Sequence, residues 1–149
     1  MRGYWNDPDA TRAAIKDGWM RTGDAGRLEV DGYLYLADRL KDIIISGGEN
    51  VASVEVEDVL YRAAGVRECA VIARPHPLWG EAVHAVVVSE TLSARDASAL
   101  DAHCRASLAG FKIPRSWDIR KEALPRNSVG KVLKHELRAQ LLLQPPAES

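Results

Sequence analysis

A cluster of charged side chains runs directly into a short apolar strand and a pair of glycines in the stretch DRLKDIIISGGEN, residues 38–50. The pattern of the sequence changes at this stretch. Residues 1–37 carry hairpin signals, whereas residues 42–143 alternate between strand and helix signals. Because an isolated hairpin is only marginally stable in water, we expect residues 1–37 to need a partner surface.

Two local elements are predicted before residue 38. Apolar and polar side chains alternate over residues 27–30 and 33–36, on either side of Asp31-Gly32, which predicts a hairpin with a two-residue loop. A short helix is expected over residues 8–16, with Asp7 as its cap and a proline at its first position.

The part after residue 41 predicts an α+β fold, a mixed sheet flanked by helices. Apolar runs and alternation predict four strands, at residues 42–46, 68–74, 82–89 and 115–120. Helical spacing and end signals predict three helices: residues 53–64 capped by Ser53, a helix opened by a capping box of Ser93 and Asp96 and ending near Gly110, and residues 132–143. The tail, residues 144–149, is predicted to be disordered.

The composition excludes several classes of function. The net charge of −1 over 149 residues gives no footprint for nucleic acid or an anionic membrane. No apolar run approaches the ~18 residues that span a bilayer, and no signal peptide is recognised, so we expect a cytoplasmic protein. Cys69, Cys104 and the four histidines lack metal-ligand spacing, which predicts buried thiols and no metal site.

Lys131 is the strongest candidate for chemistry. It ends the run LPRNSVGK, residues 124–131, directly before the last expected helix. A cation at a helix N-terminus opposes the helix dipole, so local stability gives no reason for a lysine there. Pro125 and Gly130 restrict and direct the backbone of this run. Two interpretations stay open from the run alone: a solvated surface lysine, or an ammonium group presented to a ligand.

Three runs in this order resemble the C-terminal part of the adenylate-forming enzymes. They are WMRTGD at residues 19–24, DRLKDIIISGGEN at 38–50 and LPRNSVGK at 124–131, with Trp79-Gly80-Glu81 between the last two. The superfamily includes acyl-CoA synthetases, firefly luciferase and the adenylation domains of peptide synthetases. The resemblance extends over nearly the whole chain. It implies that residues 1–37 are the tail of an N-terminal AMP-binding domain, 38–41 a hinge, and 42–143 a small C-terminal lid domain.

The resemblance also implies a reaction. A carboxylate attacks the α-phosphate of ATP to give an acyl-adenylate and pyrophosphate, and coenzyme A then displaces AMP. The full-length protein would thus be an ATP-dependent ligase of a carboxylic acid, expected to be a fatty acid, with CoA. Mg²⁺ would accompany ATP with its ligands outside this chain. The phosphate loop and acyl pocket of the family are absent, so we expect the isolated chain to be inactive.

Individual residues match the motifs of the family. Lys131 matches the lysine that contacts the carboxylate and phosphate oxygens during adenylation. Asp24 matches a carboxylate that binds both ribose hydroxyls, and Arg39 a contact to the ribose or a phosphate. The alternatives are that Asp24 satisfies a turn after Gly23, and that Arg39 forms a surface ion pair with Asp38 or Asp42.

The hinge and the glycine pair serve the second half-reaction in this resemblance. Lys41, with Asp38, occupies the position of the hinge, about which the small domain turns between half-reactions. Gly47 and Gly48 would line the channel for the pantetheine arm of CoA, and the alternative is a plain turn between strands. Two other identities stay open: a fragment of a peptide-synthetase adenylation domain, and a non-catalytic stand-alone binding or regulatory module. The run ISGGEN is closer to the CoA ligases.

Overall fold

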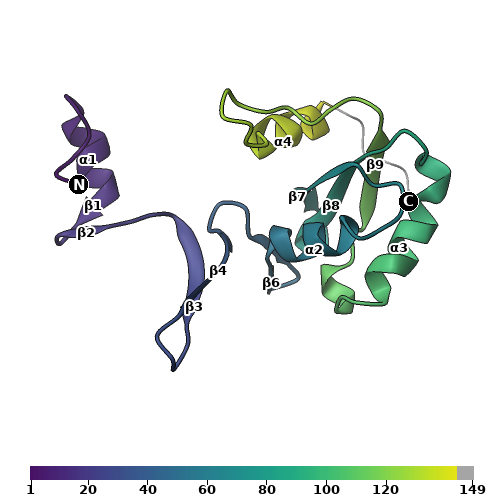
Figure 1. Ribbon diagram of the computed structural model, residues 1–149, viewed down its shortest axis with the longest axis horizontal. Coiled ribbons are helices and arrows are strands. Elements are labelled where there is room, and N and C mark those ends of the chain that lie inside the picture. The colour runs from purple at the N-terminus through teal and green to yellow at the C-terminus, as the bar shows by residue number, and fades with distance from the viewer. Residues whose placement is uncertain (144–149) are drawn as a thin grey trace. The chain divides into compact units, whose positions relative to one another are not determined.

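A computed structural model describes residues 1–143 (Figure 1). The chain divides into two compact units, and the division falls between Lys41 and Asp42. Unit 1 is the part up to Lys41, and unit 2 is the part from Asp42 onward. The predicted disordered tail, residues 144–149, lies outside the described residues.

Unit 1 begins with the expected short helix. Helix α1 (Pro8–Ala14) is capped by Asp7, whose carboxylate accepts a hydrogen bond of 2.8 Å from the amide of Ala10. The helix ends earlier than predicted, because strand β1 (Ile15–Lys16) pairs with β2 (Trp19–Met20). The two residues between these strands have positive φ angles, which is the conformation of a tight hairpin turn.

The predicted hairpin is present, with a different loop. Strands β3 (Asp24–Leu28) and β4 (Leu34–Arg39) pair antiparallel. The amide of Glu29 donates to the carbonyl of Tyr33 at 2.9 Å, and the amide of Gly32 donates to the carbonyl of Glu29 at 3.0 Å. Gly32 has φ +84°, so the loop has three residues and ends in a left-handed glycine, and the two-residue prediction was wrong. A register shift then brings Asp24 opposite Arg39.

Unit 2 contains the expected mixed sheet. Its five strands are β5 (Ile44–Ser46), β6 (Glu49–Val51), β7 (Glu68–His76), β8 (Gly80–Val88) and β9 (Ser116–Arg120). The order is β6-β5-β8-β7, and β9 runs parallel to β8. Strands β7 and β8 are longer than predicted. Their pairing continues through Pro75, which is tolerated because β7 is an edge strand.

Helices cover both faces of this sheet (Figure 1). On one face, α2 (Ser53–Leu60) and α3 (Ala97–Arg105) pack against alternate residues of β7 and β8. On the other face, α4 (Lys134–Leu142) packs against the residues between them. Both faces are therefore buried, which explains the nearly continuous apolar runs of β7 and β8. In the described part of the chain, no helix is both long and apolar enough to cross a bilayer.

Several predicted helix ends differ from the structure. Ser53 is the first residue of α2 and not its cap, since Ala52 holds the capping position. The capping box of Ser93 and Asp96 is present, but it opens a single 3₁₀ turn, η1 (Ala94–Asp96). Helix α3 follows η1 and ends before a second such turn, η2 (Gly110–Lys112). Helix α4 starts two residues later than predicted, because the preceding residues close a loop around Lys131.

Candidate functional site

Lys131 lies in a closed loop, exposed to solvent. Arg126 and Val132 form an isolated antiparallel bridge at the base of this loop. The amide of Asn127 donates to the carbonyl of Lys131 at 3.0 Å, and the Asn127 side-chain oxygen accepts from the amide of Lys131 at 2.8 Å. We call residues 126–132 the lysine loop. Lys131 is thus outside the first turn of α4, and the argument from the helix dipole was wrong.

The side chain of Arg126 ties the lysine loop to the sheet. Its Nη1 donates to the carbonyl of Gly130 at 2.7 Å, and its Nη2 lies 2.8 Å from Oε2 of Glu68, the first residue of β7. The loop therefore has one contact to its own backbone and one to the edge strand through a single guanidinium group. Gly130, directly before Lys131, has φ +81°, a conformation that favours glycine.

Asp24 and Arg39 form an ion pair across the β3–β4 hairpin. The Arg39 Nε lies 2.9 Å from Oδ1 of Asp24, and both side chains are partly exposed. The sequence analysis considered Asp38 and Asp42 as ion-pair partners of Arg39, and did not consider Asp24. Thr22, and not Asp24, satisfies the turn around Gly23, because its hydroxyl accepts from the amide of Asp24 at 3.2 Å. The two predicted nucleotide contacts are thus brought side by side in unit 1.

Gly47 and Gly48 form the two-residue turn between β5 and β6. Their φ angles are +60° and +89°, which a type I′ turn requires at both positions. An added Cβ on Gly47 would lie 3.7 Å from the ring of Trp79, and one on Gly48 would meet nothing within 4 Å. The plain-turn interpretation therefore accounts for the backbone of both glycines.

Three side chains stack beside this glycine turn. The rings of Trp79 and His76 are parallel, with centroids 4.5 Å apart, and the Arg115 guanidinium lies 4.7 Å from the Trp79 ring. The carbonyl of Trp79 accepts a hydrogen bond of 3.1 Å from the amide of Gly47. The sequence analysis missed His76 and Arg115. The only signal in the sequence was Trp79, an aromatic residue in the run Trp79-Gly80-Glu81.

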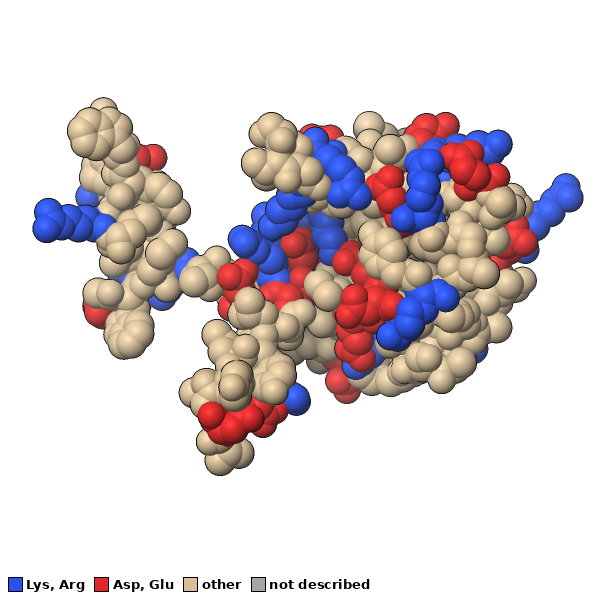
Figure 2. Space-filling view, in the orientation of Figure 1, with Lys and Arg blue, Asp and Glu red and all other residues tan. Residues whose placement is uncertain are grey.

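The glycine turn and the lysine loop occupy separate parts of unit 2. In Figure 1 the segment before α4 lies at the upper side of this unit, and the β5–β6 hairpin lies at its lower side. Charged side chains of both signs are interspersed over the face shown in Figure 2. Because the lysine loop and the glycine turn lie on different sides of unit 2, a ligand that contacts Lys131 and a ligand that contacts the glycine turn would approach different surfaces of the unit.

Partly buried ion pairs fix α4, which follows the lysine loop. The Lys134 Nζ lies 2.7 Å from a carboxylate oxygen of Glu57 on α2 and 2.6 Å from the hydroxyl of Ser53. Arg138 lies 2.7 Å from Asp42, the first residue of unit 2. These contacts hold α4 to α2 and to Asp42, which directly follows the predicted hinge. Sequence reasoning did not find them.

Neither cysteine is activated. Cys69 on β7 and Cys104 on α3 are buried, as predicted. Burial raises the pKa of the Cys69 thiol to about 12 and that of the Cys104 thiol to about 11, so both stay protonated at neutral pH. Among residues 1–143, no group of three His, Cys, Asp or Glu side chains is placed to hold a metal ion.

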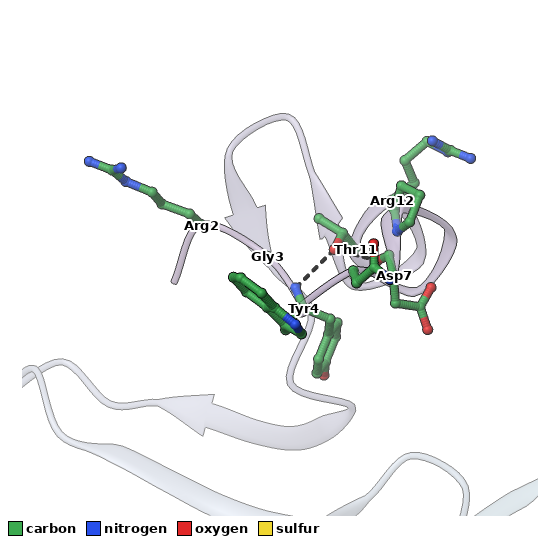
Figure 3. A pocket seen from close by; sticks show the side chains of 9 residues that line it. Arg2, Gly3, Tyr4, Asp7, Thr11 and Arg12 are labelled. Atoms are coloured by element: carbon green, nitrogen blue, oxygen red, sulfur yellow. Dashed lines mark hydrogen bonds between the residues drawn. The ribbon is translucent and has the colours of Figure 1, made fainter.

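A shallow hollow in unit 1 serves local structure (Figure 3). Residues of α1 and of the segment before it line this hollow. The Thr11 hydroxyl accepts from the amide of Tyr4 at 2.9 Å and donates to the carbonyl of Asp7 at 2.7 Å. An added Cβ on Gly3 would lie 2.8 Å from the Thr11 side chain. These polar groups hold the turn onto α1, and none of the predicted site residues lies here.

Comparison with known proteins identifies the family. The model of the AMP-binding enzyme C-terminal domain matches residues 55–131, a match that ends on Lys131. A feruloyl-CoA synthase of Amycolatopsis sp is 48% identical over 138 residues, which are 93% of this chain and 28% of that protein. A long-chain-fatty-acid–CoA ligase of Mycobacterium tuberculosis is 47% identical over 140 residues, 94% of this chain and 27% of that protein.

A solved structure agrees with these relatives. The o-succinylbenzoate CoA synthetase of Bacillus subtilis, in complex with its acyl-adenylate intermediate, matches 93% of this chain with a TM-score of 0.85 and 38% identity. The match covers 28% of that protein, so the chain spans little more than a quarter of the length of these relatives. From the family match and the shared fold, the chain belongs to the AMP-binding enzyme C-terminal domain family.

Proposed function

We propose that this chain is the C-terminal part of an ATP-dependent ligase that joins a carboxylic acid to coenzyme A. The observation that carries the proposal is the ordered, exposed lysine loop in a chain whose relatives are acyl-CoA ligases. In this proposal unit 2 is the lid, unit 1 belongs to the larger domain, and residues 38–41 are the hinge. The larger domain supplies the phosphate loop and the acyl pocket.

Lys131 acts in the first half-reaction. A carboxylate oxygen of the acid attacks the α-phosphorus of ATP, and the bond to pyrophosphate breaks with its electron pair leaving on pyrophosphate. The Lys131 ammonium contacts the incoming carboxylate and the phosphate oxygens, and so offsets their repulsion and stabilises the developing charge. A lysine suits this role because it is a point charge on a flexible stem.

The Asp24–Arg39 pair binds the nucleotide in this proposal. A carboxylate has two acceptor oxygens, which matches the two neighbouring hydroxyls of a ribose. Arg39 holds the carboxylate from the opposite strand and adds a positive charge near the phosphates. Mg²⁺ enters with ATP as part of the substrate, and its ligands belong to the larger domain.

The second half-reaction uses the glycine turn. The thiolate of CoA attacks the carbonyl carbon of the acyl-adenylate, and AMP leaves. Gly47 and Gly48 present backbone without side chains to the pantetheine arm. Because the glycine turn and the lysine loop lie apart in unit 2, a rotation about residues 38–41 between the two steps would exchange them at the active site.

The substrate is a fatty or related carboxylic acid. The relatives act on different acids, as their names feruloyl-CoA synthase and long-chain-fatty-acid–CoA ligase state. In such ligases the acyl group is bound by the larger domain, so the acid is proposed here as a class.

A grafting experiment tests this function. The chain replaces the matching segment of the Mycobacterium tuberculosis ligase, and formation of acyl-CoA and AMP is measured with ATP and a long-chain fatty acid. We expect the graft to restore activity to a truncated ligase, whereas the isolated chain is inactive and binds ATP weakly. A folded graft that forms neither product would contradict the proposal. Tight ATP binding by the isolated chain would instead favour a stand-alone binding module.

A further inference from the structure

We infer that Arg126 and Glu68 form a clamp that positions Lys131 for the adenylation step. This inference rests on the proposed function of Lys131. It adds two positioning residues, which do not themselves contact the reacting groups. Arg126 is the first residue of the lysine loop, and its guanidinium contacts both the carbonyl of Gly130 and the carboxylate of Glu68.

Apart from this pair, the lysine loop is held to unit 2 at its end, where the partly buried Val132 packs against the core beneath α4. The side chains of residues 127–131 are exposed, and Val129 between them packs against no core. Hydrogen bonds to Asn127 close the loop on itself but do not fix it to the rest of unit 2. Within the described residues, the Arg126–Glu68 pair supplies a side-chain connection between the loop and the sheet.

Glu68 is a rigid reference point for this connection. It opens β7, whose next residues pair with β8 over the full length of both strands. Ala70 and Ile72, further along β7, lie in the core beneath α4. The clamp therefore connects the backbone directly before Lys131 to the start of a strand that is paired with β8 along its whole length.

Arginine is suited to this task in a way that lysine is not. Its planar guanidinium offers donors in a fixed fork, so one side chain binds two acceptors in a defined geometry. The contact to Glu68 is a charge-assisted hydrogen bond, shorter and stronger than a neutral one. An exposed ion pair alone contributes little free energy, and 41% of the Arg126 side chain is exposed. The second contact of the guanidinium, to the carbonyl of Gly130, is therefore what makes the pair a clamp on the loop.

Two measurements on Arg126→Gln test the clamp. In the grafted ligase, we expect the single-turnover rate of adenylation to fall by roughly 10-fold to 100-fold, because a small displacement of a catalytic group has effects of this size. Thioester formation from supplied acyl-adenylate should stay within about twofold, since Lys131 does not act in that step. In the 149-residue chain, amide hydrogen exchange at residues 127–131 should become faster.

Matched variants separate positioning from general damage. Arg105→Gln removes the Arg105–Asp101 ion pair of 2.5 Å on α3, which lies on the other face of the sheet, and should change neither half-reaction. Arg126→Lys should fall between wild type and Arg126→Gln, because one ammonium group replaces the fork less well. Glu68→Gln should reproduce the selective loss with a smaller size.

The outcomes distinguish this inference from the proposed function. If Lys131→Ala abolishes adenylation while Arg126→Gln behaves like Arg105→Gln, the clamp is overturned and the function of Lys131 stands. If Lys131→Ala has no effect on adenylation, the proposed function fails, and the clamp loses its catalytic role with it. An equal loss of both half-reactions in Arg126→Gln and Glu68→Gln would contradict selective positioning.

Discussion

His84 is buried in the middle of β8, with 2% of its surface exposed. Its Nδ1 lies 2.7 Å from the Ser116 hydroxyl, and among the described residues its Nε2 has no hydrogen-bond partner. Burial, and then the charge of Arg74, lowers the pKa of His84 to about 4 from its ordinary value of 6.5. The folded protein therefore holds this imidazole neutral at physiological pH.

The lowered pKa of His84 predicts that the free energy of unfolding decreases in acid. The unfolded chain takes up a proton on His84 near pH 6.5, whereas the folded chain resists it until about pH 4. The contribution of the neutral His84 to the free energy of unfolding is complete above pH 6.5 and is lost as the pH falls toward 4. At 1.36 kcal/mol per pKa unit, this loss is about 3 kcal/mol. Urea unfolding of the chain between pH 7 and 4 should show a flatter dependence in His84→Gln than in wild type.

The exposed His135 on α4 provides the control for this measurement. His135→Gln should leave the pH dependence of wild type unchanged. Parallel curves for wild type and His84→Gln would show that the buried imidazole does not set the acid sensitivity.

The Asp24–Arg39 pair shows what sequence reasoning can reach at the scale of single residues. A two-residue loop at Asp31-Gly32 places Asp24 opposite Arg39 when the pairing is counted outward, so the hairpin prediction already contained this contact. The structure reaches the same pair by another route, since its three-residue loop is offset by a register shift between Ala25 and Gly26. The ion pair between the two side chains was missed because each was considered only with its neighbours in sequence.

At the scale of elements, the placement of α4 depends on charges buried between helices. Lys134 and Glu57 each have 15% of the side chain exposed. Burying such a pair costs desolvation free energy, and removing one partner is strongly destabilising. We therefore expect Lys134→Met to lower the free energy of unfolding by roughly 3 kcal/mol. Urea unfolding monitored by circular dichroism measures this change.

A second substitution tests the cause of that loss. Adding Glu57→Gln to Lys134→Met should recover part of the stability, because the carboxylate is removed while an amide oxygen still accepts from the amide of Val71. Lys121→Met, at an exposed position, should leave stability within about 0.5 kcal/mol. No recovery in the double variant would contradict the assignment of the loss to the buried carboxylate.

The predicted hinge is also tested at this scale. Lys41→Pro restricts the backbone of Lys41 and of the residue before it. In the grafted ligase, we expect thioester formation to slow by at least about tenfold while adenylation is retained, because only the second step requires the rotation. Normal rates of both half-reactions in this variant would remove the hinge from the account.

The sequence predicted elements better than their ends. All the strands and helices expected from apolar periodicity are present in the described residues, because burial on two faces of one sheet imposes that periodicity. The ends of α2, α3 and α4 differ from the prediction. Ser53 gives up the capping role to bind Lys134, 81 residues away, and the lysine loop delays the start of α4.

At the scale of the molecule, long-range side-chain pairs decide how the candidate site is held. Arg126 and Glu68 are 58 residues apart, and Arg138 and Asp42 are 96 residues apart. Motifs identified Lys131, Asp24 and Arg39 as candidates, since each lies in a run that resembles a family pattern. The contacts that hold the lysine loop come from packing between distant segments, which a single sequence does not specify, whereas the Asp24–Arg39 pair follows from the predicted hairpin.

The division of the chain into two compact units also bears on function at the scale of the whole molecule. Unit 1 exposes large apolar side chains of its hairpin, including Val30, Tyr33 and Leu36. A two-stranded hairpin of this kind needs a partner surface, and in the proposed function the larger domain provides it. The catalytic account therefore requires one lysine from unit 2 to reach an active site that is built mainly by other parts of the enzyme.

The half-reactions of Lys131→Ala in the grafted ligase test this central claim most directly. We predict that the rate of acyl-adenylate formation falls by roughly 10²–10³-fold, while the rate of thioester formation from supplied acyl-adenylate stays within about twofold of wild type. Equal losses in the two half-reactions, or an unchanged rate of adenylation, would contradict the assignment of Lys131 to the first step.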